Sequence, residues 1–128
     1  IEDGVWTAAR IQQYPSGGGF MSPHRDVTEG AKSVGLEYVQ LLLLMTKKGV
    51  DYERGGGFIQ RNGETIMWDD FGELGDVIVY DGSTMHGVQD IDPHKSLDLD
   101  TFTGRIVAVC PLYKDLGDVA KWNAPKDR

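Results

Sequence analysis

Three residues of this chain have the types and spacing of a metal-binding site. His24 and Asp26 are separated by one residue, so both side chains project to the same side if the backbone is extended there. His86 follows an apolar segment and the small-residue turn Gly82-Ser83, so it can open a new strand. Two imidazoles and one carboxylate on one face leave three positions of an octahedral ion free, which suits non-haem Fe(II). We therefore predict that His24, Asp26 and His86 are catalytic metal ligands.

Each of these residues taken alone has a simpler interpretation. His24 and Asp26 are also consistent with a surface histidine beside a turn aspartate, and His86 with a hydrogen bond to a loop carbonyl. The metal-site prediction therefore depends on all three side chains meeting at one point. The remaining histidine, His94, is expected to be a solvated loop residue.

Arg105 is the second informative position, because it opens the otherwise apolar segment 106–109. A guanidinium among valines is costly unless a counter-anion or several acceptors satisfy it, and its planar fork matches a carboxylate. In the alternative interpretation, Arg105 lies at the mouth of a strand and reaches solvent. Upstream, Arg10, Gln12 and Tyr14 alternate along one face of a period-two segment, so they would line the same cavity if that face looks inward.

The elements that must position these residues are short and rich in β-branched residues, and 17 glycines and 5 prolines separate them. The pair Asn62-Gly63 predicts a hairpin, because a type I′ turn needs positive φ at both positions. A short helix is expected over 115–122. The predicted strands cover 5–14, 38–46, 57–61, 64–68, 76–80, 85–91 and 105–112.

The pattern predicts an all-β chain with minor helix, arranged as a double-stranded β-helix or jelly-roll barrel. Its 128 residues are expected to form one domain with one core. The segments 38–46 and 105–110 are apolar on both faces, so something must cover the outer face of the sheet. We expect either a helical N-terminal segment, missing from this sequence, or a second subunit to do so.

Charge and composition exclude several classes of partner. The net charge of −7 makes binding to nucleic acid unfavourable, and the longest apolar run, 41–45, is far too short to cross a membrane. A single cysteine, Cys110, cannot form an intrachain disulfide. These features predict a soluble protein of the cytoplasm.

In this order the motifs resemble those of the iron(II)- and 2-oxoglutarate-dependent dioxygenases, and within them the prolyl-hydroxylase-like branch. The resemblance spans residues 10 to 112. The segments that carry it are Tyr14-Pro15, His24-x-Asp26, Gly-Gly-Gly-Phe at 55–58, Asp81-Gly82-Ser83-x-x-His86-Gly87-Val88 and Gly104-Arg105-Ile106.

The resemblance implies Fe(II) bound by His24, Asp26 and His86, and 2-oxoglutarate with its distal carboxylate on Arg105. It further implies that 2-oxoglutarate is decarboxylated to succinate and CO2 while O2 hydroxylates a C–H bond, with ascorbate as a candidate reductant. The substrate would be a small molecule or a peptidyl side chain. Candidate co-substrate contacts besides Arg105 are Tyr14, Gln12 and Leu42, and candidate substrate contacts are Arg10, Phe58, Val88 and Trp68.

Two departures from the family pattern concern the co-substrate. Leu42 or Leu44 occupies the position where relatives place a tyrosine that helps to hold the distal carboxylate. The hydroxyl is therefore either absent or supplied from elsewhere, with Tyr38 and Gln40 as candidate positions. The interval between His86 and Arg105 is also longer than usual, and the excess forms the polar loop 92–103, read as a mobile rim. Loops 47–55 and 92–103 are either plain surface connections or flaps that close over the pocket.

Two other functions remain open. A cupin-like module that binds a metal or small ligand without oxidative turnover would have the same barrel, but would not need a buried guanidinium opposite the metal. A structural domain that has lost its iron would not bring His24, Asp26 and His86 together.

Overall fold

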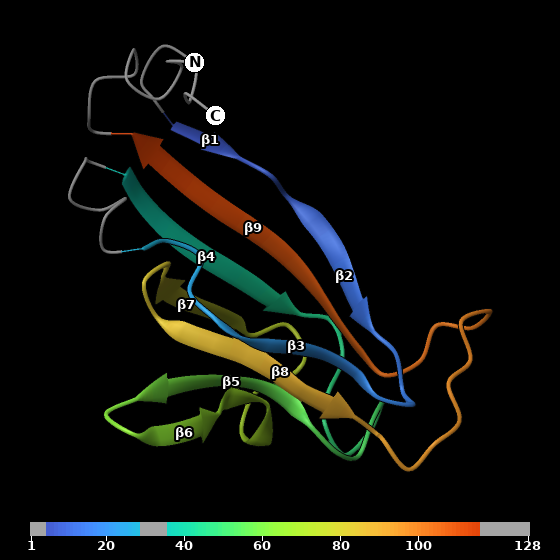
Figure 1. The fold of residues 1–128 in the computed structure, drawn as a ribbon. Helices are drawn as coiled ribbons and strands as arrows, with labels where there is room; N and C mark the ends of the chain where they lie inside the picture. Colours follow the sequence, from blue (N-terminus) through green and yellow to red (C-terminus); the bar gives the residue numbers. More distant parts are fainter. Residues whose placement is uncertain (1–4, 29–35, 116–128) are drawn as a thin grey trace, which may run out of the picture.

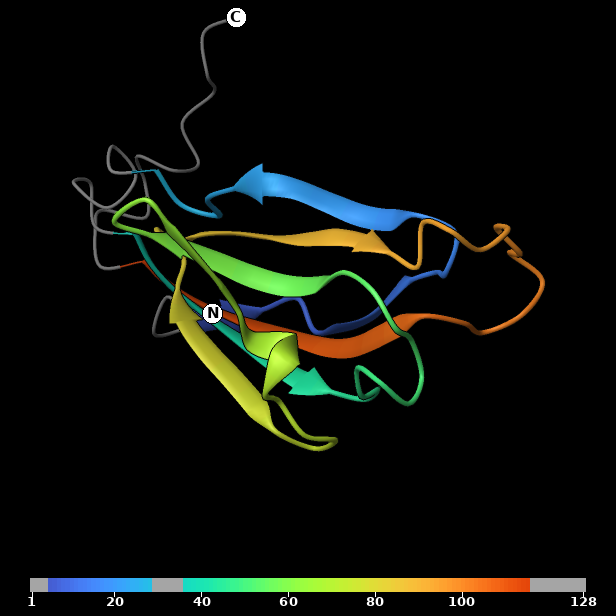
Figure 2. The same cartoon turned by 90° about the horizontal axis from the view of Figure 1, so that it is seen from below.

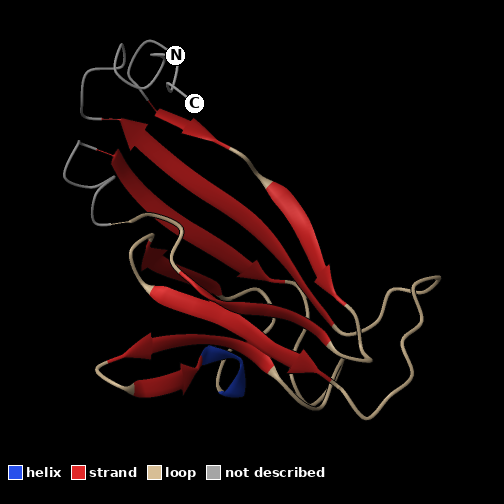
Figure 3. Ribbon diagram, in the orientation of Figure 1, coloured by secondary structure: helices blue, strands red, loops and turns tan. Residues whose placement is uncertain are grey.

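The computed structural model describes residues 5–28 and 36–115, and the regular secondary structure of this part is almost entirely β-strand (Figure 3). The prediction of an all-β chain is therefore confirmed. No helix in the described part is long and apolar enough to span a membrane. The elements are β1 (Val5–Thr7), β2 (Arg10–Tyr14), β3 (Gly19–His24), β4 (Leu36–Leu44), β5 (Gly56–Arg61), β6 (Glu64–Met67), the 3-10 turn η1 (Trp68–Asp70), β7 (Val77–Asp81), β8 (Met85–Ile91) and β9 (Arg105–Asp115).

The strands form two antiparallel sheets that lie face to face (Figures 1 and 2). The large sheet has the order β1-β9-β4-β7, and β2 continues beside β9 along the line of β1. The small sheet has the order β3-β8-β5-β6. The ladders among the described residues do not join the two sheets into a closed barrel.

Most predicted strands are present, with three differences. Segment 5–14 is interrupted at Ala8 and Ala9, so that β1 and β2 pair separately with β9. Strand β3 is not among the predicted strands; it contains Pro23, and its pairing with β8 shifts register twice. A helix is predicted over 115–122, but Asp115 is the last residue of β9. Residues 116–122 lie outside the described residues.

The predicted hairpin at Asn62-Gly63 is confirmed. Asn62 and Gly63 have φ values of 52° and 80°, and Arg61 pairs with Glu64 on either side of them. The hairpin leads directly into η1, which places Trp68 and Asp69 under the small sheet as buried residues.

The two faces of the large sheet differ in burial. Its inner face supplies core residues such as Leu42, Leu44, Val107 and Val109, each exposed by 6% or less. The outer face carries apolar side chains that remain 38–68% exposed, because no described element packs on them. What covers this face stays a prediction. Its members include Ile11, Val39, Leu43, Val77 and Val79.

Asp92 ties three loops together beyond the end of β8. Its buried carboxylate accepts hydrogen bonds at 2.8 Å from the backbone N–H groups of Glu53 and Arg54 and from the Ser16 hydroxyl, and at 2.9 Å from Lys95. Burial alone would raise the pKa of Asp92, but these hydrogen bonds outweigh it and hold the pKa well below its ordinary value. The expectation that Asp92 lies on an exposed rim is wrong, because four donors replace the water that its carboxylate loses.

We expect Asp92→Asn to lower the free energy of unfolding and to flatten its dependence on pH. Since the pKa of Asp92 is depressed in the folded chain, its contribution is present above the ordinary value of 3.8 and is lost as the pH falls below it. Urea unfolding at a series of acidic pH values measures this slope. The control is Asp90→Asn, which removes an exposed carboxylate two residues away. Equal slopes for both variants would contradict the assignment.

Candidate functional site

The pairing of β3 with β8 positions the two predicted histidine ligands. His24, the last residue of β3, lies directly opposite His86, the second residue of β8. The chain then bends at Asp26 instead of continuing as an extended strand, and the Val27 N–H donates to the Gly82 carbonyl at 3.0 Å. The expected extended backbone is therefore wrong at Asp26, but the bend turns its carboxylate toward both imidazoles.

The three side chains converge as the sequence predicted. His24 Nε2 lies 3.4 Å from Asp26 Oδ1, and His86 Nε2 lies 3.5 Å from Asp26 Oδ2. The two ring centroids are 4.3 Å apart, and one potential ligand atom from each residue lies within 4.8 Å of the others. Neighbouring ligand atoms of an octahedral ion are about 3 Å apart, so a small inward movement suffices to bind one.

Both imidazoles are oriented for metal binding by backbone carbonyls. His24 Nδ1 contacts the Ser22 carbonyl at 2.8 Å, and His86 Nδ1 contacts the Thr84 carbonyl at 2.9 Å. Since a carbonyl only accepts, each Nδ1 carries the proton and each Nε2 keeps its lone pair for a metal. Burial lowers the pKa of His86, with a further contribution from His24, although the Thr84 carbonyl and Asp26 oppose the shift. His86 is thus favoured in the neutral form that binds metals.

A cavity between the two sheets connects this cluster with Arg105. It encloses about 410 Å³ of empty space, some of it open to solvent. Ten of the predicted site residues line it: Arg10, Gln12, Tyr14, His24, Asp26, Leu42, Trp68, His86, Val88 and Arg105. Further lining residues include Met21, Tyr38, Gln40, Tyr80, Val107 and Val109.

Phe58, predicted to touch substrate, is not among the lining residues. It is 4% exposed and pairs with Gly87, where an added Cβ would come within 2.7 Å of the Phe58 ring. Phe58 therefore packs in the small sheet and is not placed to contact a ligand in the cavity.

Arg105 is buried and carries its own counter-anion. Only 2% of its side chain is exposed, so the interpretation of Arg105 as a solvent-reaching strand end is wrong. Its Nε donates to Asp69 Oδ2 at 2.6 Å, and its Nη2 donates to Asp69 Oδ1 at 3.3 Å. The counter-anion that the sequence led us to seek in a ligand is thus already present in the chain.

Asp69 is held by further donors besides Arg105. Its Oδ2 accepts hydrogen bonds from the Gly57 N–H at 2.8 Å and from the Tyr52 hydroxyl at 2.5 Å. Gly56, with φ 131°, leaves room for it, because a Cβ there would come within 2.9 Å of the Asp69 Cβ. These contacts fix Asp69 so firmly that the orientation of the Arg105 guanidinium follows from it.

Sequence reasoning missed Asp69 and Tyr52 as partners of Arg105. Asp69 is followed by Asp70, and nothing local distinguishes the two aspartates. The hydroxyl group closest to this role is that of Tyr52, which donates to Asp69, the partner of Arg105. The Tyr38 hydroxyl donates to Gln40 instead.

Loops 47–55 and 92–103 lie at the opposite end of β8 from the metal cluster. His86 and Ile91 stand five residues apart in this strand, or roughly 16 Å. Asp92 then binds the backbone of Glu53 and Arg54, which joins the two loops at that end. They therefore do not lie beside the metal cluster, and their closure over the pocket stays a prediction.

His94 lies in one of these loops, as predicted. It is 36% exposed, and its Nε2 lies 3.3 Å from Glu53 Oε2. Together with Asp92 it forms a second group of potential ligands, but the Lys95 ammonium already contacts both carboxylates of that group. A bound cation would have to displace this lysine, so we assign no metal there.

Comparison of the chain with protein-family models, with curated proteins and with solved structures found no match.

We expect His24→Ala and His86→Ala each to weaken binding of a divalent metal by at least about 100-fold, since each removes one of three ligand atoms. The matched control is His94→Ala, which removes the remaining histidine and leaves the cluster intact. Calorimetric titration with Fe(II) under anaerobic conditions measures the affinity. Unchanged affinity in the first two variants would show that the metal binds elsewhere.

We expect Asp69→Asn to lower the free energy of unfolding by about 3 kcal/mol, because it leaves the Arg105 charge buried and unpaired. The matched control is Asp70→Asn, whose carboxylate is 54% exposed and pairs with Lys48 at 2.5 Å. Its loss should cost less than about 1 kcal/mol. Chemical denaturation measures both, and equal effects would contradict the role given to Asp69.

Proposed function

We propose that this chain is an iron(II)- and 2-oxoglutarate-dependent dioxygenase that hydroxylates a C–H bond. One observation carries the proposal: the Nε2 atoms of His24 and His86 and the carboxylate of Asp26 converge at a cavity that also contains a guanidinium. The chemistry of this donor set fits Fe(II), because two imidazoles and one carboxylate leave positions for a co-substrate and O2. The substrate is a small molecule or a peptidyl side chain.

The strand order supports a jelly roll of the double-stranded β-helix type. Such a fold distributes eight strands over two four-stranded sheets, pairing the first with the last. Counted from β2, the eight strands alternate between the sheets except at the hairpin of β5 and β6, which lies wholly in the small sheet. Strand β2 pairs with β9, and β3 pairs with β8. In this arrangement β3 and β8 bring the histidines to one end of the cavity.

In the proposed enzyme, His24, Asp26 and His86 hold the iron. The iron supplies the activation of O2, by which 2-oxoglutarate becomes succinate and CO2 and the substrate gains a hydroxyl group. Ascorbate is a candidate reductant for the metal. Apolar side chains around the cavity, including Leu42, Val88 and Val107, limit access of water to the oxidising centre.

Arg105 binds the distal carboxylate of 2-oxoglutarate in this proposal, with Asp69 as its fixed support. A guanidinium has five N–H donors, and Asp69 engages Nε and Nη2. Among the described residues, no second carboxylate pairs with the edge of the guanidinium that includes Nη1. This edge can therefore donate hydrogen bonds to a ligand carboxylate. The Tyr14 ring, whose centroid is 5.6 Å from the Arg105 Cζ, closes one side of this position.

A specific observation favours the alternative of a cupin-like binding module. The pairing of Arg105 with Asp69 gives the guanidinium a structural reason to be buried, independent of any co-substrate. A module without oxidative turnover would bind the metal through the same three ligands but would have no affinity for 2-oxoglutarate.

The two functions are separated by anaerobic addition of Fe(II) and then 2-oxoglutarate. We expect the weak visible charge-transfer band of the chelate in the unmodified chain and in His94→Ala, and its loss in His86→Ala. Arg105→Met combined with Asp69→Asn removes both charges of the buried pair, and should retain the metal but weaken 2-oxoglutarate binding by about 10-fold or more. Metal binding without the band in the unmodified chain would favour the binding module.

A further inference from the structure

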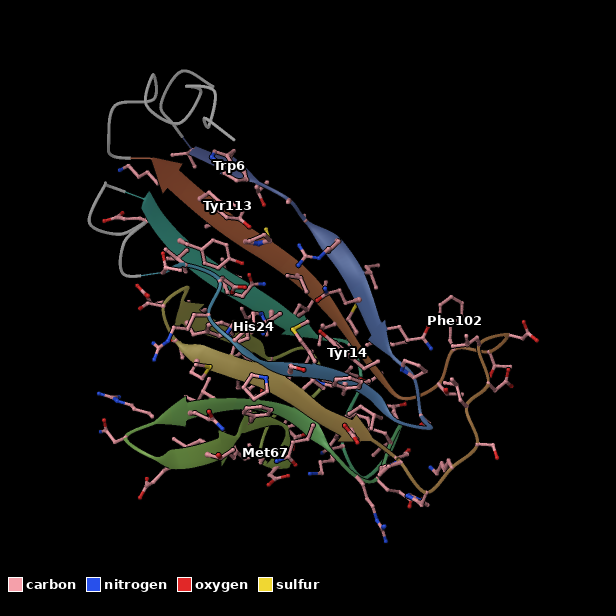
Figure 4. The ribbon with its side chains drawn as sticks, viewed as in Figure 1. Trp6, Tyr14, His24, Met67, Phe102 and Tyr113 are labelled. Carbon is pink, nitrogen blue, oxygen red and sulfur yellow. The ribbon has the colours of Figure 1, made fainter. Side chains whose placement is uncertain are left out.

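Three aromatic side chains continue the inner face of the large sheet beyond the cavity. Trp6, Tyr113 and Tyr38 are register partners across β1, β9 and β4 and form what we call the aromatic shelf. The Trp6 and Tyr113 rings are stacked, with centroids 3.7 Å apart and planes 6° apart, and Tyr113 meets Tyr38 edge-on at 4.5 Å. Figure 4 shows Trp6 and Tyr113 side by side at the end of the large sheet, with His24 farther along, at the small sheet.

The aromatic shelf begins at the metal cluster. Tyr38 lines the same cavity as His24 and Asp26. The Gly82 N–H donates to the Tyr38 carbonyl, and the Gly82 carbonyl accepts from Val27, next to Asp26. A Cβ at Gly82 would lie 2.3 Å from the Tyr38 ring, so only glycine allows this packing. The Tyr38 end of the aromatic shelf therefore lies next to the metal ligands.

The outer ring of the aromatic shelf is available to a ligand. Trp6 is 42% exposed, although one of its faces is covered by Tyr113. Burial raises the pKa of Tyr38, and the charge of Asp26 acts in the same direction, so this tyrosine stays neutral at physiological pH. An uncharged, partly exposed aromatic surface favours a planar apolar group.

A cation stands beside the aromatic shelf. Arg10 lines the cavity, and its Nη1 donates to the Ala8 carbonyl at 3.2 Å, which holds the guanidinium near Ala8, two residues along the chain from Trp6. The other cavity arginine, Arg105, is neutralised by Asp69, whereas Arg10 forms no ion pair with a described carboxylate. Of the two guanidiniums that line the cavity, Arg10 is therefore the one whose positive charge is free to pair with an anionic ligand.

We propose that Arg10 and the aromatic shelf form a substrate subsite for a small aromatic carboxylate, with the ring on Trp6 and the carboxylate on Arg10. The inference deepens the proposed function, on which it rests for the oxidation itself, and narrows the substrate class to aromatic acids. The Arg10 fork matches a carboxylate in bidentate fashion, and the exposed face of Trp6 offers offset stacking. The ligand would thus lie on the face of the large sheet that leads, through Tyr113 and Tyr38, to the cavity of the metal ligands.

The probe is 2-naphthoate, compared with 2-naphthylmethanol, which lacks the charge, and cyclohexanecarboxylate, which lacks the ring. Titrations are made calorimetrically in EDTA, so that no carboxylate binds through a metal. We expect the unmodified chain to bind 2-naphthoate about 10-fold more tightly than either relative. Arg10→Gln should abolish the preference over the alcohol, and Trp6→Leu the preference over cyclohexanecarboxylate. Arg61→Gln, which removes an exposed arginine on β5, should change neither.

Equal affinity of the unmodified chain for the three probes would overturn the subsite, as would a charge preference that persists in Arg10→Gln. Arg10→Lys keeps the charge without the fork and should retain part of the preference. Circular dichroism of each variant reports its folding, and Arg10 is exposed, so its replacement leaves the core intact. Because these titrations need neither iron nor 2-oxoglutarate, their outcome is independent of whether the chain is a dioxygenase.

Discussion

The buried ion pair between Arg105 and Asp69 is the constraint on which the cavity depends. Arg105 begins β9 of the large sheet, and Asp69 lies in the turn that follows the hairpin of the small sheet, so the pair fastens one sheet to the other. Neither charge would be tolerated alone at this depth. The Gly57 N–H and the Tyr52 hydroxyl satisfy the remaining capacity of the carboxylate. The end of the cavity at Arg105 is therefore formed by a buried polar group whose members are held by hydrogen bonds to one another.

At the other end of the cavity, strand pairing and backbone hydrogen bonds position the metal ligands. His24 and His86 face each other because β3 and β8 are paired in one register, and backbone carbonyls set the orientation of both rings. Asp26 reaches them from a bend, where its carboxylate lies close to both Nε2 atoms. A two-histidine, one-carboxylate group thus forms without any long loop, which suits a site that must hold an ion in a defined geometry.

The two arginines that line the cavity differ in whether a carboxylate of the chain neutralises them. Arg105 and Asp69 cancel each other, so in the proposed enzyme Arg105 would bind a carboxylate through its unused N–H donors more than through net charge. Arg10 keeps its charge uncompensated among the described residues and stands near the aromatic rings. In the proposed enzyme the two guanidiniums would therefore bind two different anions, one beside Asp69 and one near the aromatic shelf.

The sequence by itself determined the all-β class, the hairpin at Asn62-Gly63 and the three candidate ligands, because alternation, turn chemistry and residue type are local properties. It did not reveal that Asp92 is buried or that Asp69, and not its neighbour Asp70, pairs with Arg105. Those outcomes depend on which side chains meet after residues 36 or more positions apart come together, as Arg105 and Asp69 do. Only the tertiary structure decides such contacts, because burial and the supply of hydrogen-bond donors are properties of the packed chain.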